Sequence, residues 1–239
     1  MEDYIKFSRS TVEKYLSCPR CCVLEKNHKI RPPSLPFTLN NAVDNLCKNE
    51  FDYYRFRQEP HPLFIQHNIK AIPYNHHNLN TWRSNFQGIR HRSLTHKYDF
   101  GGAIDDVWVK ENGDLIVADV KATSKNNFDW SETCKNYEYP KAYKRQLEMY
   151  QWLFKKNGFK VADEAYLIYF NGKKNEDFFH NTLQFETHII KLTCSTDWVE
   201  KKVLETAQLL RSKEFPSPSK NCELCNYLRK RWNLSRKVS

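Results

Sequence analysis

Two apolar runs separated by a tight turn constrain most strongly how this chain can fold. The residues from Tyr98 to Lys110 and from Leu115 to Thr123 are β-like in pattern, and Glu111-Asn112-Gly113-Asp114 lies between them. An Asn-Gly pair between such runs is a strong signal for a β-hairpin. We therefore predict two paired strands over these two ranges.

The second run ends in two charged residues. Asp119 and Lys121 follow the apolar stretch Leu115–Ala118, and because they are two positions apart on a strand, both side chains point to one face. Asp105 lies fourteen positions before Asp119, so strand pairing can bring the two carboxylates side by side. A lone Asp-x-Lys is more often an ordinary ion pair, but charges at the end of a buried strand are costly unless they are used or paired.

Two adjacent carboxylates repel each other, and a divalent cation relieves that repulsion. Carboxylate oxygens are hard ligands that suit Mg²⁺ or Mn²⁺. A lysine beside such an ion can help to deprotonate a water molecule and can stabilise the charge that develops on a phosphate. Asp106 is an alternative to Asp105, because adjacent strand residues face opposite ways and only one of them can join Asp119.

The motifs around the hairpin resemble those of the PD-(D/E)XK nuclease superfamily, in particular its RecB-like branch and the CRISPR-associated nucleases with a cysteine-bound cluster. Gly102-Ala103-Ile104-Asp105 is similar to the Gly-x-Ile-Asp of that branch, and Asp119-Val120-Lys121 to its (D/E)-x-K. The run from Gln146 to Tyr150 matches the Gln-x-x-x-Tyr on the helix that follows, and the segment from Phe7 to Pro19 resembles the opening helix. The resemblance spans nearly the whole chain apart from residues 55–95.

This resemblance implies a mixed α/β (α+β) fold, in which helices flank the central mixed sheet of a restriction-endonuclease-like core. It favours Asp105 over Asp106 as the first carboxylate. The residues that it assigns to the reaction centre are Asp105, Asp119 and Lys121 as catalytic groups, with Asp105, Asp119 and the Val120 carbonyl as metal ligands. Gln146 and Tyr150, which share one face of a helix, would contact the substrate strand or steady the site.

One metal ligand of the related nucleases, a histidine on an early helix, has no counterpart here. Apolar residues recur every three to four positions from Leu39 to Arg57 and predict a helix, but its first six residues contain no histidine. Asp44 is the candidate substitute, because a carboxylate suits Mg²⁺. An ordinary surface residue is an equally good interpretation of Asp44, and in that case the metal would be held less firmly.

Eight cysteines are present, and half of them form two C-x-x-C pairs near opposite ends of the chain: Cys18 with Cys21, and Cys222 with Cys225. Together the pairs make a four-sulfur site that would clamp the N-terminal helix to the C-terminal tail. Spacing alone favours tetrahedral Zn²⁺, whereas the resemblance favours a [4Fe–4S] cluster, which is our first expectation. Cys22 could replace Cys21 or be a small buried side chain. The isolated cysteines are expected to pack in the core: Cys47, Cys134 and Cys194.

The 239 residues suit a single domain. We expect a nuclease-like domain over residues 1–239, with an N-terminal helical part (1–95), a catalytic core (96–195) and a C-terminal helix followed by a cysteine-containing and basic tail (196–239). The other predicted helices cover Ser8–Glu25, Tyr143–Asn157 and Thr196–Ser212, and the other predicted strands cover Ala165–Phe170 and Phe185–Leu192.

The net charge of +10 favours a polyanionic partner. In the basic tail, Tyr227 and Trp232 lie among arginines and lysines, a combination that can bind a single strand, although a frayed basic terminus explains the pattern equally well. No apolar run is long enough to cross a membrane, and the chain begins without a signal-peptide pattern, so we expect a cytoplasmic protein with reduced thiols.

The function implied by the resemblance is that of a Mg²⁺- or Mn²⁺-dependent deoxyribonuclease. It would hydrolyse DNA phosphodiester bonds as an exonuclease, or at single strands and ends, in repair, recombination or defence. The rival interpretation is a nucleic-acid-binding module on the same scaffold, with little or no hydrolysis.

Overall fold

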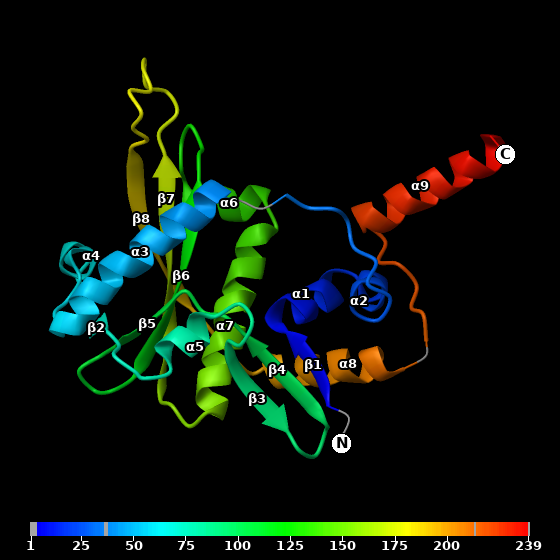
Figure 1. Ribbon diagram of the computed structural model, residues 1–239, viewed down its shortest axis with the longest axis horizontal. Coiled ribbons are helices and arrows are strands. Elements are labelled where there is room, and N and C mark those ends of the chain that lie inside the picture. The colour runs from blue at the N-terminus through cyan, green and yellow to red at the C-terminus, as the bar shows by residue number, and fades with distance from the viewer. Residues whose placement is uncertain (1–3, 36–37, 213, 239) are drawn as a thin grey trace. The chain divides into compact units, whose positions relative to one another are not determined.

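The computed structural model describes residues 4–35, 38–212 and 214–238. The chain divides into two compact units. The smaller unit is drawn from residues 1–34, 92–100 and 198–239, and the larger from residues 35–91 and 101–197. Figure 1 labels the helices and strands that belong to each unit.

The larger unit is built on a five-stranded sheet in the order β2-β5-β6-β7-β8. Its strands are β2 (Ile72–Pro73), β5 (Asp106–Val109), β6 (Leu115–Thr123), β7 (Val161–Gly172) and β8 (Phe185–Thr193). β6 and β7 pair in parallel, and the other neighbours pair antiparallel. The predicted mixed sheet is therefore confirmed.

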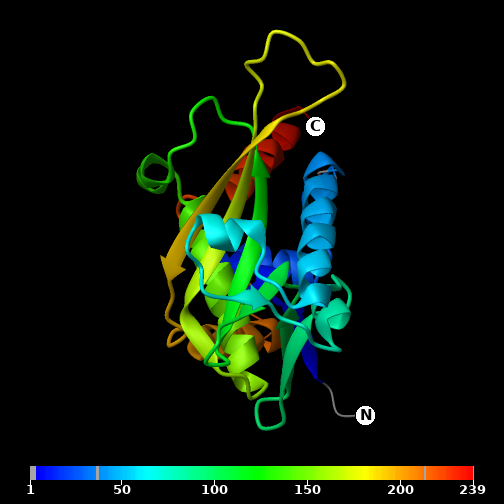
Figure 2. The same cartoon turned by 90° about the vertical axis from the view of Figure 1, so that its left-hand side faces the viewer.

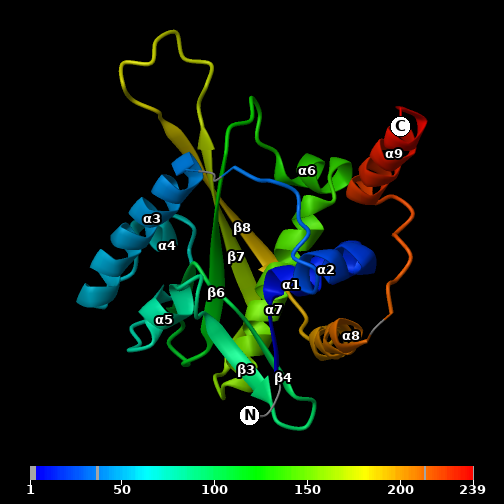
Figure 3. The same cartoon turned by 45° about the vertical axis from the view of Figure 1, so that its right-hand side comes forward.

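Helices cover both faces of this sheet. On one face α3 (Thr38–Arg57) contributes Phe51, whose ring stacks on that of Trp108 with centroids 5.8 Å apart. On the other face lies α7 (Tyr139–Lys156). Figures 2 and 3 show the strands between these two helices. The predicted arrangement of a sheet flanked by helices is thus present.

The two faces of β6 differ in chemistry because successive strand residues point to opposite sides. The side chains that join the core beneath α3 are Ile116, Ala118 and Val120. Asp119 and Lys121 point to the other face and contact residues of α7. Asp119 and Lys121 therefore share one side of the sheet, as their two-residue spacing predicts.

The predicted hairpin is confirmed between β5 and β6, but its first strand is not continuous. The range from Tyr98 to Lys110 divides into β4 (Tyr98–Gly102) and β5, which belong to different sheets. Between them the N–H of Ile104 donates a hydrogen bond of 3.0 Å to the carbonyl of Trp82, a residue distant in sequence. In the turn, Gly113 has φ +83°, a conformation that other residues rarely adopt.

The smaller unit contains β1 (Ile5–Ser8), α1 (Arg9–Ser17), α2 (Pro19–Lys26), α8 (Val199–Arg211) and α9 (Glu223–Val238). The prediction of one helix over residues 8–25 was wrong: Cys18 is extended, with φ −159° and ψ 106°, because the proline after it disfavours helical backbone at that position. The hydroxyl of Tyr15 donates to Glu205 at 3.0 Å and ties α1 to α8. The basic tail beyond residue 222, for which the sequence predicted no helix, is helical.

The remaining elements are short. They are β3 (Ile89–Ser93), α4 (Pro62–Gln66), α5 (Leu79–Arg83) and α6 (Trp130–Asn136). β1, β4 and β3 form a three-stranded sheet in that order. None of the helices within the described ranges is long and apolar enough to cross a membrane.

Candidate active site

Asp105 and Asp119, the two predicted carboxylates, lie close together in the larger unit. Asp119 is on β6 and is 1% exposed, while Asp105 lies in the connection just before β5. Oδ2 of Asp105 accepts a hydrogen bond of 2.8 Å from the N–H of Val120. In the ladder it is Asp106, not Asp105, that pairs with a β6 residue, Ala118. The break between β4 and β5 thus delivers Asp105 to the site, whereas we had expected strand register to do so.

Lys121 completes this centre. Its Nζ donates a hydrogen bond to Oδ2 of Asp119. Burial raises the pKa of Asp119 to about 7; Lys121 opposes the rise and Asp105 adds to it. Burial disfavours the charged form of Lys121, but the two carboxylates outweigh this and raise its pKa. Lys121 therefore carries a positive charge at neutral pH, which suits electrostatic stabilisation of a phosphate rather than proton abstraction.

Gln146 reaches the Asp119 carboxylate from α7, and Tyr150 supports Gln146 from the same helix. Nε2 of Gln146 donates to Oδ1 of Asp119 at 2.6 Å and to the hydroxyl oxygen of Tyr150 at 3.2 Å. Gln146 is 7% exposed and Tyr150 is 2% exposed. Of the two roles expected for this pair, the contacts correspond to steadying the site, because neither side chain offers much surface to a substrate strand.

Asp44 lies on α3, where Lys48 connects it to Asp105. Nζ of Lys48 donates to Oδ2 of Asp44 at 2.6 Å and lies 3.5 Å from Oδ1 of Asp105. Burial and the charge of Asp105 raise the pKa of Asp44. Within the described ranges, Oδ1 of Asp44 is buried without a hydrogen-bond partner. Asp44 is therefore partly buried and is linked to Asp105 through Lys48.

The acidic residues of this centre match a divalent cation in their donor chemistry. Oxygen ligands are those that Mg²⁺ and Mn²⁺ prefer, and a cation would relieve the repulsion between Asp105 and Asp119 and satisfy the unpartnered oxygen of Asp44. The three aspartates are not a compact ligand set of the kind that the cysteines form. Instead, Lys48 and Lys121 neutralise them.

A buried ion network, which was not predicted from the sequence, holds the segment that contains Asp105. Arg83 donates through Nε to the carbonyl of Asp105 at 3.0 Å and through Nη2 to Oδ2 of Asp106 at 3.1 Å. Arg55 donates to the other oxygen of Asp106, and Asp52 accepts hydrogen bonds from both arginines. Asp106 is thus a structural counter-charge. Asp52 and Arg55 are three positions apart on one helix, and this spacing was the signal that the sequence offered. Arg83 lies within residues 55–95, where the sequence motifs showed no resemblance.

The four paired cysteines come together in the smaller unit. Sγ of Cys21 lies 3.5 Å from that of Cys222 and 3.4 Å from that of Cys225, and Sγ of Cys18 lies 3.9 Å from that of Cys225. All four sulfurs lie within 4.8 Å of one another, so they can bind a metal ion. Cys22 stands apart from them, since its thiol donates to the carbonyl of Thr11 at 3.6 Å.

The thiols of this group differ in acidity. Burial opposes ionisation of Cys18, but hydrogen bonds from the backbone N–H groups of Ser219 and Cys21 lower its pKa to about 6. Burial raises the pKa of Cys225 to about 11. A thiolate is therefore favoured at Cys18 before Cys225, as is useful for recruiting a cation.

The isolated cysteines divide into two kinds. Cys47 and Cys194 are buried, as predicted, but the prediction that Cys134 packs in the core was wrong. Cys134 lies on the short α6, where it is exposed.

In the basic tail, Arg229 and Trp232 are exposed on α9.

Comparisons with known proteins place the chain in a family. A candidate exonuclease from Eubacterium rectale is 12% identical, with a TM-score of 0.45, and the match covers 95% of this chain and 88% of that one. SSO0001 is 16% identical with a TM-score of 0.41, over 90% of this chain and 80% of its own. LHK-Exo, solved in complex with dAMP, is 12% identical with a TM-score of 0.41, and the match covers 100% of this chain and 96% of that one. No curated protein sequence matches.

The family model provides the assignment. The model of the PD-(D/E)XK nuclease superfamily matches residues 38–229, which include the whole centre from Asp44 to Tyr150 and the second cysteine pair. Such a match supports a phosphodiester-hydrolysing nuclease with the restriction-endonuclease-like fold. This chain belongs to the PD-(D/E)XK nuclease superfamily.

Proposed function

We propose that this protein is a Mg²⁺- or Mn²⁺-dependent deoxyribonuclease that hydrolyses DNA phosphodiester bonds at single strands or ends. The observation that carries the proposal is the meeting of Asp105, Asp119 and Lys121 beside β6. The metal would be held by Asp105, Asp119 and the carbonyl of Val120, with Asp44 as a further ligand. Repair, recombination and defence are the processes that such an activity serves.

A divalent cation bound there would polarise a phosphate and lower the pKa of a water molecule. The residues of the chain provide the remaining functions. Lys121 holds a positive charge beside the carboxylates, where it would stabilise charge that develops on the phosphate. Gln146 keeps the Asp119 carboxylate in one orientation, and Arg83 fixes the main chain of Asp105. These contacts pre-organise the centre before substrate arrives.

Metal dependence gives the first test. Wild-type protein is expected to degrade linear single-stranded DNA in Mg²⁺ or Mn²⁺, to stop when a chelator is added, and to resume when the cation is restored. The reason is that a bound cation would polarise the phosphate and activate the attacking water. Release of acid-soluble nucleotides measures the rate. Circular DNA, duplex DNA and RNA as parallel substrates reveal the need for an end and the preferred nucleic acid.

The second candidate function is a nucleic-acid-binding module with weak or no hydrolysis. The observation in its favour is that α3 carries no histidine facing the centre, and that Lys48 lies between Asp44 and Asp105. DNA binding without cleavage under every cation tried would establish this function and remove the catalytic one.

We also propose that both units belong to one nuclease domain, because the family match extends over residues of each.

We further propose that the four cysteines hold a structural metal. A tetrahedral zinc ion with Zn–S bonds of about 2.3 Å places its sulfurs about 3.8 Å apart. The Sγ–Sγ distances of 3.4, 3.5 and 3.9 Å agree with that spacing. In a [4Fe–4S] cluster each thiolate binds a different iron, which holds the sulfurs farther apart. The spacing therefore supports a single zinc ion, and the cluster expected from the sequence resemblance becomes the alternative.

Elemental analysis separates these two metals. The purified protein is expected to contain about one zinc per chain, and Cys21→Ser is expected to lose it. Cys134→Ser is the matched control, because Cys134 is exposed on α6 and lies outside the group. About four irons per chain with equimolar sulfide would instead identify the cluster. Protein that binds neither metal after reconstitution under reducing conditions would contradict both assignments.

A further inference from the structure

A second lysine beyond the reaction centre is held among aromatic side chains. Lys125 lies four residues after Lys121, in the segment that follows β6. Its Nζ donates hydrogen bonds to the hydroxyl of Tyr139 at 2.7 Å and to Oγ1 of Thr133 at 3.1 Å. The same Nζ lies 4.9 Å from the ring centroid of Tyr137. α6 and the first turn of α7 thus surround this ammonium group.

Hydrogen bonds to Asn171 of β7 fix the main chain of Lys125. Its N–H donates to Oδ1 of Asn171 at 2.7 Å, and Nδ2 of Asn171 donates back to its carbonyl at 3.1 Å. Ser124 adds a hydrogen bond of 2.9 Å to the carbonyl of Gly172. Asn171 is 3% exposed. A buried amide whose donor and acceptor are both satisfied holds its partner in one place, so Lys125 has a defined position.

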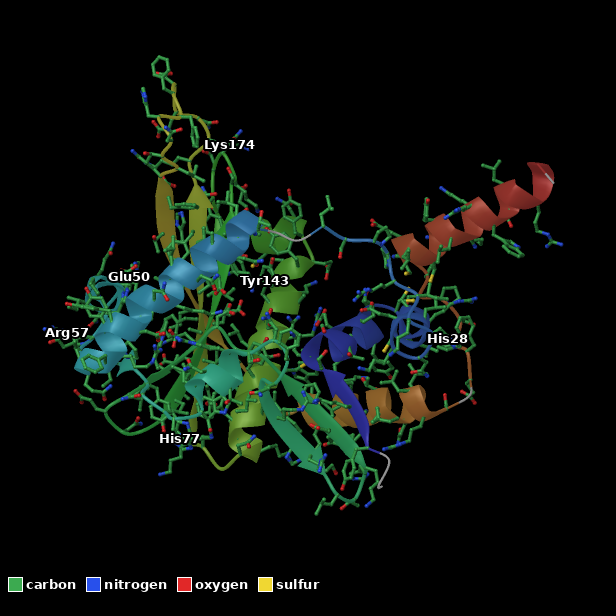
Figure 4. All side chains as sticks on the ribbon, in the orientation of Figure 1. His28, Glu50, Arg57, His77, Tyr143 and Lys174 are labelled. Carbon is green, nitrogen blue, oxygen red and sulfur yellow. The ribbon has the colours of Figure 1, made fainter. Side chains whose placement is uncertain are left out.

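Three tyrosines lead from Lys125 back to the reaction centre. The ring centroids of Tyr137 and Tyr139 are 5.4 Å apart, and those of Tyr139 and Tyr143 are 5.3 Å apart. Nζ of Lys121 lies 4.7 Å from the ring centroid of Tyr143, which Figure 4 labels on α7. Tyr137 is 52% exposed, and the other two are half-buried. We call Tyr137, Tyr139 and Tyr143 the tyrosine row.

We propose that the tyrosine row and Lys125 form a subsite for the unpaired part of a nucleic-acid substrate. This subsite is distinct from the carboxylates of the reaction centre, where the strand would be cut. The proposal deepens the proposed function and rests on it for the identity of the substrate. Every nucleobase has an aromatic face, so stacking on tyrosine binds single strands without regard to sequence. Paired bases inside a duplex keep those faces covered, and the subsite therefore selects unpaired strands.

The position of Lys125 suits a phosphate other than the one that is cut. An extended strand rises about 3.3 Å per residue, so the main chains of Lys121 and Lys125 lie up to about 13 Å apart. Their ammonium groups lie over different rings, Lys121 over Tyr143 and Lys125 over Tyr139, which suits contacts with different phosphates. An ammonium group has three hydrogens, and two of them are donated to Thr133 and Tyr139. The third is suited to a phosphate oxygen of the same strand.

Stacking, rather than net charge, is expected to dominate at this subsite. From Asp129 to Arg145 the charged residues nearly balance one another. They are Asp129, Glu132 and Glu138 on the acidic side, and Lys135, Lys141, Lys144 and Arg145 on the basic side. Since stacking does not depend on charge, the contribution of the tyrosine row is expected to persist when salt is raised, whereas phosphate contacts weaken.

The test compares binding of single-stranded and blunt duplex DNA. Fluorescence anisotropy with a labelled oligothymidine is measured in Ca²⁺, over times during which the DNA remains intact. Tyr137→Ala and Lys125→Met are each expected to weaken single-strand binding about tenfold and to leave duplex binding within about twofold. Raising the salt should reduce the effect of Lys125→Met but not that of Tyr137→Ala.

Tyr53→Ala is the matched control, because Tyr53 is 58% exposed on α3 and also has a cation, Arg57, over its ring at 5.5 Å. It is expected to bind both DNAs as wild type does. The subsite is overturned, even if the wild-type protein cleaves DNA, in either of two cases. Tyr137→Ala binds single-stranded DNA as well as wild type does, or it loses affinity equally for single-stranded and duplex DNA. If Tyr137→Ala selectively loses single-strand binding but the wild-type protein never cleaves DNA, the subsite is supported and the nuclease proposal is refuted. The two failures are therefore distinguishable.

Discussion

Lys121→Met is expected to slow DNA cleavage by about a hundred- to thousandfold, the usual effect of losing one preorganised electrostatic contact at a reaction centre. Lys121 donates to Asp119, and the surrounding carboxylates raise its pKa, so its charge is present throughout the neutral range. Methionine keeps an apolar stem beside the ring of Tyr143 but removes the charge. DNA binding is therefore expected to change far less than the rate.

Single-turnover cleavage with excess protein measures this effect separately from binding. Lys110→Met is the matched control: Lys110 pairs with Glu164 at 2.9 Å near the start of β6, at the opposite end from Lys121. Its rate is expected to remain within about twofold of wild type, as for most surface substitutions. Cleavage by Lys121→Met at the wild-type rate would exclude Lys121 from the chemistry, whatever the family pattern implies.

Asp106→Asn is expected to lower the free energy of unfolding by about 3–5 kcal/mol, because removal of one partner leaves buried charge uncompensated. Asp106 is 2% exposed and contacts the guanidinium groups of both Arg55 and Arg83. Asparagine has nearly the same shape but no charge. Since Arg83 also binds the carbonyl of Asp105, the substitution is expected to disturb the reaction centre as well.

Asp52→Asn is the control for this prediction. Asp52 contacts the same two arginines, but its side chain is 44% exposed, so the cost is expected to be about 1 kcal/mol or less. Urea unfolding followed by tryptophan fluorescence reports on the larger unit, which contains Trp82 and Trp108. Equal, small losses in the two variants would mean that Asp106 is not the counter-charge that holds the arginines.

The sequence by itself determined the local features of this protein. Hairpin formation follows from an Asn-Gly turn in which Gly113 takes a positive φ, and the shared face of Asp119 and Lys121 follows from the two-residue period of a strand. The four-residue spacing of Gln146 and Tyr150 likewise places both on one side of α7. Each of these outcomes depends on residues within a few positions of one another, where backbone geometry decides the result.

Other features were decided by the tertiary structure alone. The break that presents Asp105, the arginines that hold Asp106, and the lysine that links Asp44 to Asp105 all depend on contacts between residues more than twenty positions apart. Periodicity in a sequence window carries no information about such partners, because packing selects them only when helices and strands come together. The sequence therefore predicted which groups come together, whereas the tertiary structure determined how they are held in place.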